Sequence, residues 1–310
     1  MSGPSRTISV GGFSLRPMPA PVLLIGHGGM LARAWRAVLE RVNAEVVCPT
    51  LEQCDFTRPQ TVRDVVNARE GGFGLVINCA AWTDVDGAEA KEDAAYDVNA
   101  EGPAVLAEAC RHSGSLLVHY STDYVFRGDA SAPYSVDEPM APVGAYGRTK
   151  AAGELALRDS GCRHLIIRTS WLYAPWGKNF VRTIAGLCKA KPSLKVVNDQ
   201  RGRPTSAEHL AAASLALVQA GAGGGGAGAA EGGTWHITDG GECTWFDFAR
   251  EINRVQGTAC DVQPCTTAEF PRPARRPAYS VLDLSRTEAA IGPMPDWKAN
   301  LADVMSRLEP

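Results

Sequence analysis

Strand-like apolar runs alternate with helical segments through the first half of the chain. The strand-like runs cover 21–25, 45–48, 75–78, 116–120 and 164–168. After the first run, apolar residues recur at helical spacing, at Leu31, Trp35, Val38 and Val42. Continuous apolar strands that alternate with amphipathic helices are typical of a parallel sheet covered on both faces. The pattern therefore predicts an α/β protein built on a doubly wound parallel sheet.

A glycine-rich turn joins the first strand to the first helix. Gly26, Gly29 and Ala32 follow the spacing GxxGxxA. Gly26 permits a tight turn, and Gly29 lets the backbone approach a pyrophosphate at the N-terminus of the helix. A glycine turn without a ligand is the alternative, but strand, turn and helix in this order is the context of a dinucleotide site. We therefore expect a Rossmann domain.

Tyr146 and Lys150 lie four residues apart at the start of a helix-forming stretch. Positions i and i+4 share one face of a helix, so we expect the ammonium to lower the pKa of the phenol. Tyr146 would then donate a proton to a carbonyl oxygen. Thr122 follows the apolar run 116–120, so its hydroxyl lies at the carboxyl end of a strand, where open α/β sheets bind ligands. An accidental YxxxK on an exposed helix is the alternative, which Thr122 and the glycine turn disfavour.

The second strand ends without a carboxylate, in Pro49, Thr50 and Leu51. An acid at that place holds the ribose of NAD, so its absence favours NADPH and leaves NADH open. Asp55 and Phe56 follow and are expected to flank the adenine. Capping of a turn is the alternative role for Asp55.

The third strand ends in small residues, which allow a dinucleotide to lie close to the backbone. Ala80 and Ala81 are followed by Trp82 and Thr83. The acidic run 84–93 that comes next is expected to be a solvated face.

Composition narrows the function classes. The chain has 310 residues, 45% of them hydrophobic, which suffices for one large or two modest domains. A net charge of -3 argues against nucleic-acid and membrane-surface partners. The sequence contains no run of about 18 apolar residues, so no membrane span is predicted. The nine cysteines form no CxxC pair, which favours reduced thiols in a cytoplasmic protein and no metal site.

The pattern changes after residue 170, and this change sets the expected domains. A dinucleotide-binding domain is predicted for 21–170 and 195–240, and a smaller C-terminal substrate-binding lobe for 171–194 and 241–310. Residues 1–20 contain Pro17 and Pro19 and are expected to be a flexible extension. Glycine and alanine dominate 221–233, which predicts a surface loop.

Several stretches together resemble the dTDP-4-dehydrorhamnose reductase family of the extended short-chain dehydrogenase/reductase superfamily. The most specific match is the motif YSTDYVF at 120–126. The other matching stretches are 26–32, 78–83, YGRTKAAGE at 146–154, 168–173 and 203–206. The resemblance covers nearly all of 21–308.

This resemblance implies an NADPH-dependent reductase of a dTDP-4-keto-6-deoxy sugar, with hydride delivered to C4 of dTDP-4-dehydrorhamnose. It implies a catalytic triad of Thr122, Tyr146 and Lys150. The implied cofactor residues are Met30, Leu31, Asp55, Phe56, Ala81, Trp82, Thr83 and Tyr120. The implied sugar-nucleotide residues are Val85, Asp86, Thr122, Asp123 and Trp171. Some members of the family hold magnesium at a dimer contact through a glutamate where Ala34 stands here, so we expect a monomer or weak homodimer.

Two other functions stay open. A sugar-nucleotide epimerase or dehydratase uses the same scaffold, but Asp123 is followed by Tyr124 and not by the second acid of a dehydratase. A non-catalytic NADP-binding regulatory subunit, such as that of methionine adenosyltransferase, is expected to lack the tyrosine or the lysine. Both residues are present.

Overall fold

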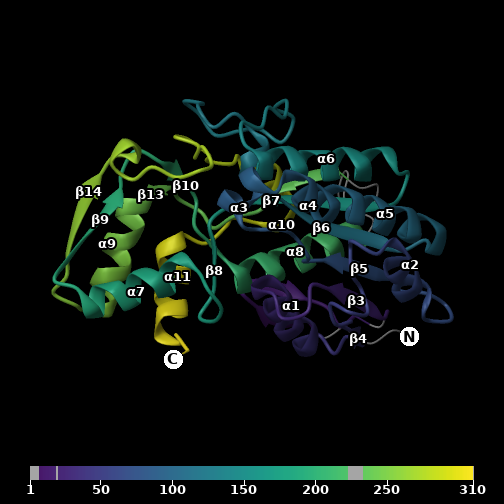
Figure 1. Ribbon diagram of the computed structural model, residues 1–310. Helices are drawn as coiled ribbons and strands as arrows, with labels where there is room; N and C mark the ends of the chain where they lie inside the picture. The colour runs from purple at the N-terminus through teal and green to yellow at the C-terminus, as the bar shows by residue number, and fades with distance from the viewer. Residues whose placement is uncertain (1–6, 19, 223–232, 310) are drawn as a thin grey trace.

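The computed structural model describes residues 7–18, 20–222 and 233–309 (Figure 1). The predicted glycine-rich loop falls mainly on residues 223–232 and lies outside the described residues. Within the described residues, no helix has the length and apolar character needed to cross a membrane.

A six-stranded parallel sheet forms the centre of the molecule, in the order β12-β7-β6-β5-β3-β4. Its strands are β3 (Val22–Ile25), β4 (Val46–Val47), β5 (Leu75–Asn78), β6 (Leu116–Thr122), β7 (His164–Thr169) and β12 (Gly233–His236). Every residue of β3, β5 and β6 is buried. Strands covered on both faces require such unbroken apolar runs.

Helices cover both faces of this sheet (Figure 1). One face carries α1 (Met30–Arg41) and α8 (Ala207–Ala222), which pack through a core that includes Trp35, Leu39 and Leu210. The other face carries α2 (Pro59–Asn67), α5 (Gly102–Ser113) and α6 (Ala145–Asp159). The doubly wound α/β fold predicted from the sequence is confirmed.

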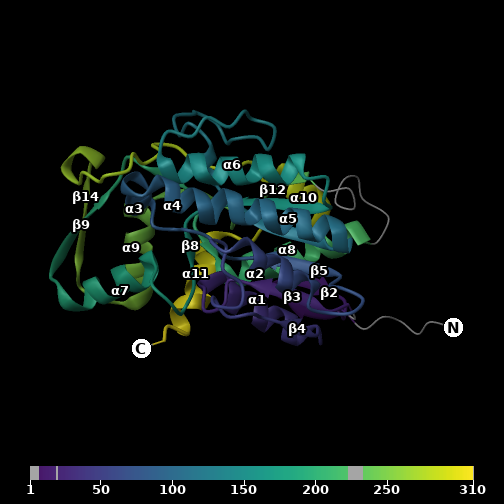
Figure 2. The same cartoon turned by 45° about the vertical axis from the view of Figure 1, so that its right-hand side comes forward.

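A smaller lobe lies at one end of the sheet, on the left in Figures 1 and 2. It contains α7 (Phe180–Ala190), β9 (Ser193–Val197), β13 (Cys243–Thr244), α9 (Trp245–Gln256), β14 (Asp261–Cys265) and α11 (Trp297–Ser306). Strand β9 pairs with β14 in parallel. Phe248, Ile252 and Leu301 are fully buried in its separate core.

Three expectations about chain organisation need correction. The N-terminal stretch contains a hairpin, β1 (Ile8–Val10) and β2 (Phe13–Leu15), and Leu15 is fully buried in the core that α8 shares. It is therefore no loose extension where the structure describes it. Strand β9 was expected to begin the return to the dinucleotide domain, but its pairing with β14 puts it in the lobe. Helix α10 (Ser285–Ile291), expected in the lobe, packs against α8 and β12.

The remaining elements are short: α3 (Val85–Ala90), α4 (Glu92–Tyr96), the π-helix η1 (Asp97–Glu101), η2 (Asp123–Val125), β8 (Leu172–Tyr173), β10 (Arg201–Gly202), β11 (Thr205–Ser206) and η3 (Thr267–Glu269). Strands β8 and β11 pair in parallel, and β10 pairs with β13. These segments connect the sheet to the lobe.

Candidate active site

The carboxyl end of β6 and the first turns of α6 bring the three proposed catalytic residues together. Thr122 is the last residue of β6, Tyr146 is the second residue of α6, and Lys150 lies one turn further along. Gly147 makes the approach possible, because a Cβ at this position would collide with the carbonyl oxygen of Tyr124. The helix is thereby held against the turn that follows β6.

Burial governs the phenol of Tyr146. It raises the pKa of Tyr146 to about 12, the charge of Asp123 adds to the rise, and the Thr122 hydroxyl opposes it. The ring meets that of Tyr124 edge-on, with centroids 5.6 Å apart. Tyr146 is therefore protonated at neutral pH, as an acid must be before it donates.

Lys150 does not act on Tyr146 as the sequence suggested. Its Nζ donates to the carbonyl oxygen of Tyr120 at 2.6 Å and lies 3.3 Å from Nε2 of His119. The expected lowering of the Tyr146 pKa by this lysine is absent, and burial raises that pKa instead. Lys150 is 2% exposed, and burial lowers its own pKa to about 8.

Asp123 is a second buried ionisable group at this end of the sheet. Burial raises its pKa to about 6, while the hydroxyl groups of Ser280 and Thr122 lower it. Thr122 Oγ1 donates to Asp123 Oδ1 at 3.0 Å and accepts from the Tyr124 amide at 3.2 Å. The threonine hydroxyl is thus oriented by its neighbours.

The glycine turn has the geometry of a diphosphate site. Gly26 has a φ of 108°, and a Cβ there would lie 2.8 Å from the carbonyl carbon of Cys79. The Gly29 amide donates to the Gly26 carbonyl at 2.9 Å, and α1 begins at Met30. Leu31 is buried in the core, so Met30 and Leu31 offer backbone N–H groups at a helix N-terminus, which favours anions.

The side chains of Asp55 and Phe56 are committed to the fold rather than to an adenine. Asp55 Oδ1 accepts from the Thr57 amide and hydroxyl, at 2.9 and 2.7 Å, and Oδ2 accepts from Nε of Arg58. This matches the turn-capping alternative. Phe56 is buried against α5, where Gly102 has no Cβ to obstruct its ring. The Asp55 backbone is engaged as well, because its N–H donates to Thr61 Oγ1 at 3.0 Å and its carbonyl accepts from the Arg58 amide at 2.9 Å.

A cation near the end of β4 escaped the sequence analysis. Arg36 of α1 is close enough to Cys48 to lower its pKa against the effect of burial. The sequence shows no arginine directly after the second strand, since Arg36 comes from the preceding helix. A guanidinium at this strand end is suited to a 2′-phosphate.

The loop after β5 is fixed by a buried asparagine. Asn99 Oδ1 accepts from the Trp82 amide at 2.9 Å, and Nδ2 donates to the Trp82 carbonyl at 3.1 Å and to Thr149 of α6 at 3.1 Å. Asn99 lies in the π-helix η1, and Gly153 of α6 packs directly on its carbonyl oxygen. The sequence analysis missed Asn99, although an asparagine, a poor helix former, inside a helical stretch was a usable signal.

The other residues expected to bind the cofactor differ in which of their groups are available to it. Ala80 and Ala81 are half-buried at the end of β5, and Thr83 is exposed. The Tyr120 phenol accepts from Trp35 and donates to Ser214, at 2.8 Å each, on the α1 and α8 face. Tyr120 therefore contributes its carbonyl, which holds Lys150, rather than its ring.

The acidic run 84–93 anchors neighbouring segments and is not merely a solvated face. Asp86 pairs with Arg276 at 2.9 Å and accepts from the Ala274 amide at 3.1 Å. Glu89 accepts from the Ala145 amide, where α6 begins, at 2.8 Å. This run therefore joins α6 to the segment from the lobe.

A cavity of about 760 Å³ opens between α3, η2 and the lobe. Asp86, Tyr124 and Arg276 line one side, and apolar residues such as Phe180 and Trp245 line the other. Trp171 stands behind the cavity wall, stacked on Trp245 with centroids 3.6 Å apart. Its φ of 46° lies in the left-handed region, where a bulky residue is strained. Val85, half-buried, begins α3 beside Asp86.

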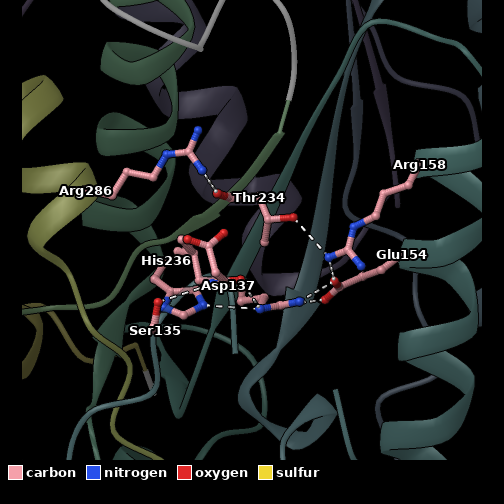
Figure 3. Close-up of polar contacts among 9 residues, drawn as sticks. Ser135, Asp137, Glu154, Arg158, Thr234, His236 and Arg286 are labelled. Atoms are coloured by element: carbon pink, nitrogen blue, oxygen red, sulfur yellow. Dashed lines mark hydrogen bonds and ion pairs between the residues drawn. The ribbon is translucent and has the colours of Figure 1, made fainter. Parts of the chain in front are cut away.

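A charged cluster holds the middle of α6 against the sheet (Figure 3). Arg168 of β7 makes a bidentate ion pair with Glu154 of α6, at 2.9 and 2.8 Å, and both are buried. Arg158 pairs with the same carboxylate at 2.7 Å. Arg168 also donates to the Val136 carbonyl at 3.2 Å, and Arg286 donates to the Thr234 carbonyl at 3.1 Å.

Comparison with known proteins shows the family of the chain. Residues 20–309 match the family described as RmlD substrate binding domain. The chain belongs to this family. No group of three or more His, Cys, Asp or Glu side chains in the described part of the chain is placed to hold a metal ion.

Two relatives and one solved structure illustrate the similarity. The dTDP-4-dehydrorhamnose reductase of Streptomyces griseus is 42% identical over 296 residues, covering 93% of this chain and 94% of the relative. A probable dTDP-4,6-dihydroxy-2-methyloxan-3-one 4-ketoreductase of Streptomyces antibioticus is 41% identical, covering 91% and 93%. The Bacillus anthracis dTDP-4-dehydrorhamnose reductase in complex with NADP is 33% identical with a TM-score of 0.87, covering 93% and 99%.

Proposed function

We propose that this protein reduces C4 of dTDP-4-dehydrorhamnose with NADPH to give dTDP-L-rhamnose. The observation that carries the proposal is the meeting of Tyr146, Thr122 and Lys150 at the carboxyl end of the sheet, next to the glycine turn. The names of the relatives and the NADP bound in the Bacillus anthracis structure support it.

The residues fit a nicotinamide cofactor. Backbone N–H groups at Met30 and Leu31 would hold the diphosphate, and Lys150 would hold the ribose hydroxyls. Ala80 and Ala81 leave room beside the backbone for the dinucleotide, between Gly26 and Lys150. When bound, NADPH supplies the hydride.

The chain's own residues supply a proton and orient the substrate. Tyr146, protonated at neutral pH, donates its proton to the oxygen on C4. Thr122 donates a hydrogen bond to the same oxygen once its hydroxyl turns away from Asp123. Asp123 is placed to accept from a sugar hydroxyl.

The 760 Å³ cavity is the proposed place of the sugar nucleotide. Its apolar wall of Phe180 and Trp245 suits a base, and Arg276 suits a diphosphate. We assign Val85, Asp86 and Trp171 to this subsite through their positions around the cavity. The Asp86–Arg276 ion pair has to share its guanidinium with the ligand.

Trp171→Ala tests this subsite. We expect dTDP-sugar affinity to fall about tenfold or more, ~1.4 kcal/mol, while NADPH affinity stays unchanged. Isothermal titration with each ligand measures both. Trp35→Phe, a change in the core between α1 and the sheet, is the control for general loosening. An equal loss of both affinities would assign Trp171 to structure alone.

A second sugar remains a candidate, because the Streptomyces antibioticus relative is named for another dTDP-keto sugar and is almost equally similar. NADPH oxidation against a panel of dTDP-4-keto sugars distinguishes the two. The highest kcat/KM identifies the substrate. Oxidation with none of them would favour the non-catalytic binding protein, and sugar interconversion without net oxidation would favour an epimerase.

We further propose a monomer or weak homodimer that acts in the cytoplasm. Ala34 is fully buried in the α1 core, so it offers no side chain for a metal-bridged contact. All nine cysteines are free thiols, which suits a reducing compartment. Light scattering at micromolar concentration measures the assembly.

A further inference from the structure

A chain of hydrogen bonds runs from the end of β5 to Lys150. Asn78 and His119 are paired neighbours on β5 and β6, and both are buried. Asn78 Nδ2 lies 3.0 Å from His119 Nδ1, and His119 Nε2 lies 3.3 Å from Lys150 Nζ. Lys150 Nζ in turn donates to the Tyr120 carbonyl at 2.6 Å.

The donor-to-acceptor direction of this hydrogen-bond chain is fixed at its first residue, Asn78. Asn78 Oδ1 accepts from the Ala80 amide at 2.9 Å. A flipped amide would set two donors against each other there, so Nδ2 must face His119. Since Nδ2 only donates, His119 Nδ1 is the acceptor and carries no proton.

The imidazole tautomer follows. Burial holds the pKa of His119 well below its usual value, so the ring is neutral and bears one proton. That proton is on Nε2, which therefore points an N–H at Lys150. An ammonium has no lone pair to accept it, whereas a free amine has one.

We propose that His119, oriented by Asn78, is a positioning residue that holds Lys150 as an uncharged amine in the cofactor-free protein. The inference rests on the proposed function only in so far as Lys150 belongs to the active site.

The other charged groups around Lys150 allow this state. Glu154, one turn along α6, favours the ammonium, but its carboxylate is already shared by Arg168 and Arg158 (Figure 3). His164 of β7 acts on His119 and further disfavours a second proton on its ring. Burial lowers the pKa of Lys150 to about 8, and donation from Nε2 favours the amine beyond that.

The test is nitrogen NMR of the full-length, cofactor-free protein labelled with ¹⁵N in histidine and lysine. His119→Phe and Lys150→Met assign the two resonances. We expect His119 as the Nε2–H tautomer, and a Lys150 titration midpoint below about 8. A Lys150 signal that remains that of an ammonium up to about pH 9, like an ordinary lysine, would overturn the proposal.

Asn78→Asp should reverse the donor-to-acceptor direction of this hydrogen-bond chain. One carboxylate oxygen accepts from the Ala80 amide and the other from His119 Nδ1–H, which leaves Nε2 as an acceptor for an ammonium. We expect the tautomer to switch and the Lys150 midpoint to rise by at least about one pH unit, tenfold in proton affinity. An unchanged tautomer would contradict the proposal.

Two further variants separate the relay from the added charge. Asn198→Asp adds the same charge in the lobe, where Asn198 accepts from Thr244, and is expected to leave Lys150 unchanged. In a His119→Phe background, Asn78→Asp should shift the titration midpoint of Lys150 less than it does when His119 is present. If His119→Phe does not fold, the tautomer switch in Asn78→Asp still decides. No activity enters these measurements, so a failure to oxidise NADPH with any dTDP-4-keto sugar would overturn the proposed reductase without altering them.

Discussion

Lys150 of α6 and Arg168 of β7 are two buried basic side chains with opposite kinds of partner. Arg168 has the bidentate carboxylate of Glu154 and a backbone carbonyl. Lys150 has a carbonyl and a neutral imidazole, with no carboxylate in hydrogen-bond contact. The paired cation fixes the helix on the sheet. The unpaired one is left with a protonation state that a ligand is able to change.

Glu154 connects the two regions. It lies four residues after Lys150 on α6, yet its carboxylate faces the arginines (Figure 3). A carboxylate shared by two guanidinium groups is a weak partner for a third cation. Within two turns of α6, Glu154 thus belongs to a part that stabilises the fold, the structural half, and Lys150 belongs to a part that takes part in the proposed reaction, the chemical half.

The largest expected effect tests the chemical half. Tyr146→Phe removes the proton donor and should lower the single-turnover rate about 100- to 10,000-fold, ~3–5 kcal/mol of barrier, while folding and NADPH binding persist. NADPH absorbance at saturating sugar nucleotide measures the rate. Tyr96→Phe, an exposed tyrosine at the end of α4, is the matched control. A Tyr146→Phe rate above about a third of wild type would remove Tyr146 from the mechanism.

The next effect tests the structural half. Arg168→Met leaves Glu154 with only the half-exposed Arg158 and should lower the free energy of unfolding by about 3–5 kcal/mol. Urea unfolding measures it. Arg158→Met should cost less than about 1 kcal/mol, and Glu154→Met in the Arg168→Met background should restore much of the loss. Equal effects of the two arginine variants would erase the contrast drawn between buried and exposed pairs.

Asp123 extends the comparison, because its buried carboxyl group has no cationic partner in hydrogen-bond contact. Its pKa rises from 3.8 to about 6 on folding. The protonated form is favoured, so its stabilising contribution is complete below pH 3.8, declines as pH rises to about 6, and is absent above. Asp123→Asn should therefore stabilise the protein at pH 7 by up to about 3 kcal/mol and change little near pH 3.5.

Unfolding curves of wild type and Asp123→Asn at both pH values check this prediction. The comparison at pH 3.5, where the wild-type carboxyl is mostly protonated, controls for any change in packing. A variant less stable than wild type at pH 7 would mean that the Thr122 and Ser280 hydroxyls stabilise the ionised carboxylate more than burial destabilises it.

The smallest expected effect concerns cofactor choice. Arg36→Ala should reduce the ratio of NADPH to NADH affinity about tenfold, ~1.4 kcal/mol, because a cation near the end of β4 is lost. Fluorescence titration with both cofactors measures the ratio. Arg41→Ala, at the far end of α1, is the control. An unchanged ratio would leave the absence of an acid after β4 as the sole basis for NADPH preference.

Local patterns predicted the sheet and the ends of β6 and α6 well, because both faces of a parallel sheet are buried and apolar runs are then unambiguous. They failed where a side chain's direction depends on distant partners. Phe56 turns into the core because Gly102, far along the chain, leaves space for its ring. Lys150 reaches a carbonyl of β6 rather than Tyr146. Neither contact has a signature in neighbouring residues.

The N-terminal hairpin was missed for a related reason. Its alternating residues form only three-residue strands, too short for a periodic signal, and Leu15 becomes buried only through contact with α8. The lobe boundary was wrong for the same reason, since β9 pairs with β14 about seventy residues later. Pairing partners of short strands are a property of the whole fold.

The two glycines of α6 have a consequence for how this protein can diverge. Gly147 admits the Tyr124 carbonyl and Gly153 admits the Asn99 carbonyl, so the smallest added side chain at either place pushes the helix off its neighbours. Directed evolution toward new sugars should find these positions closed. The wall formed by Phe180 and Trp245 carries no such restriction, and changes of substrate should accumulate there while the helix beneath stays constant.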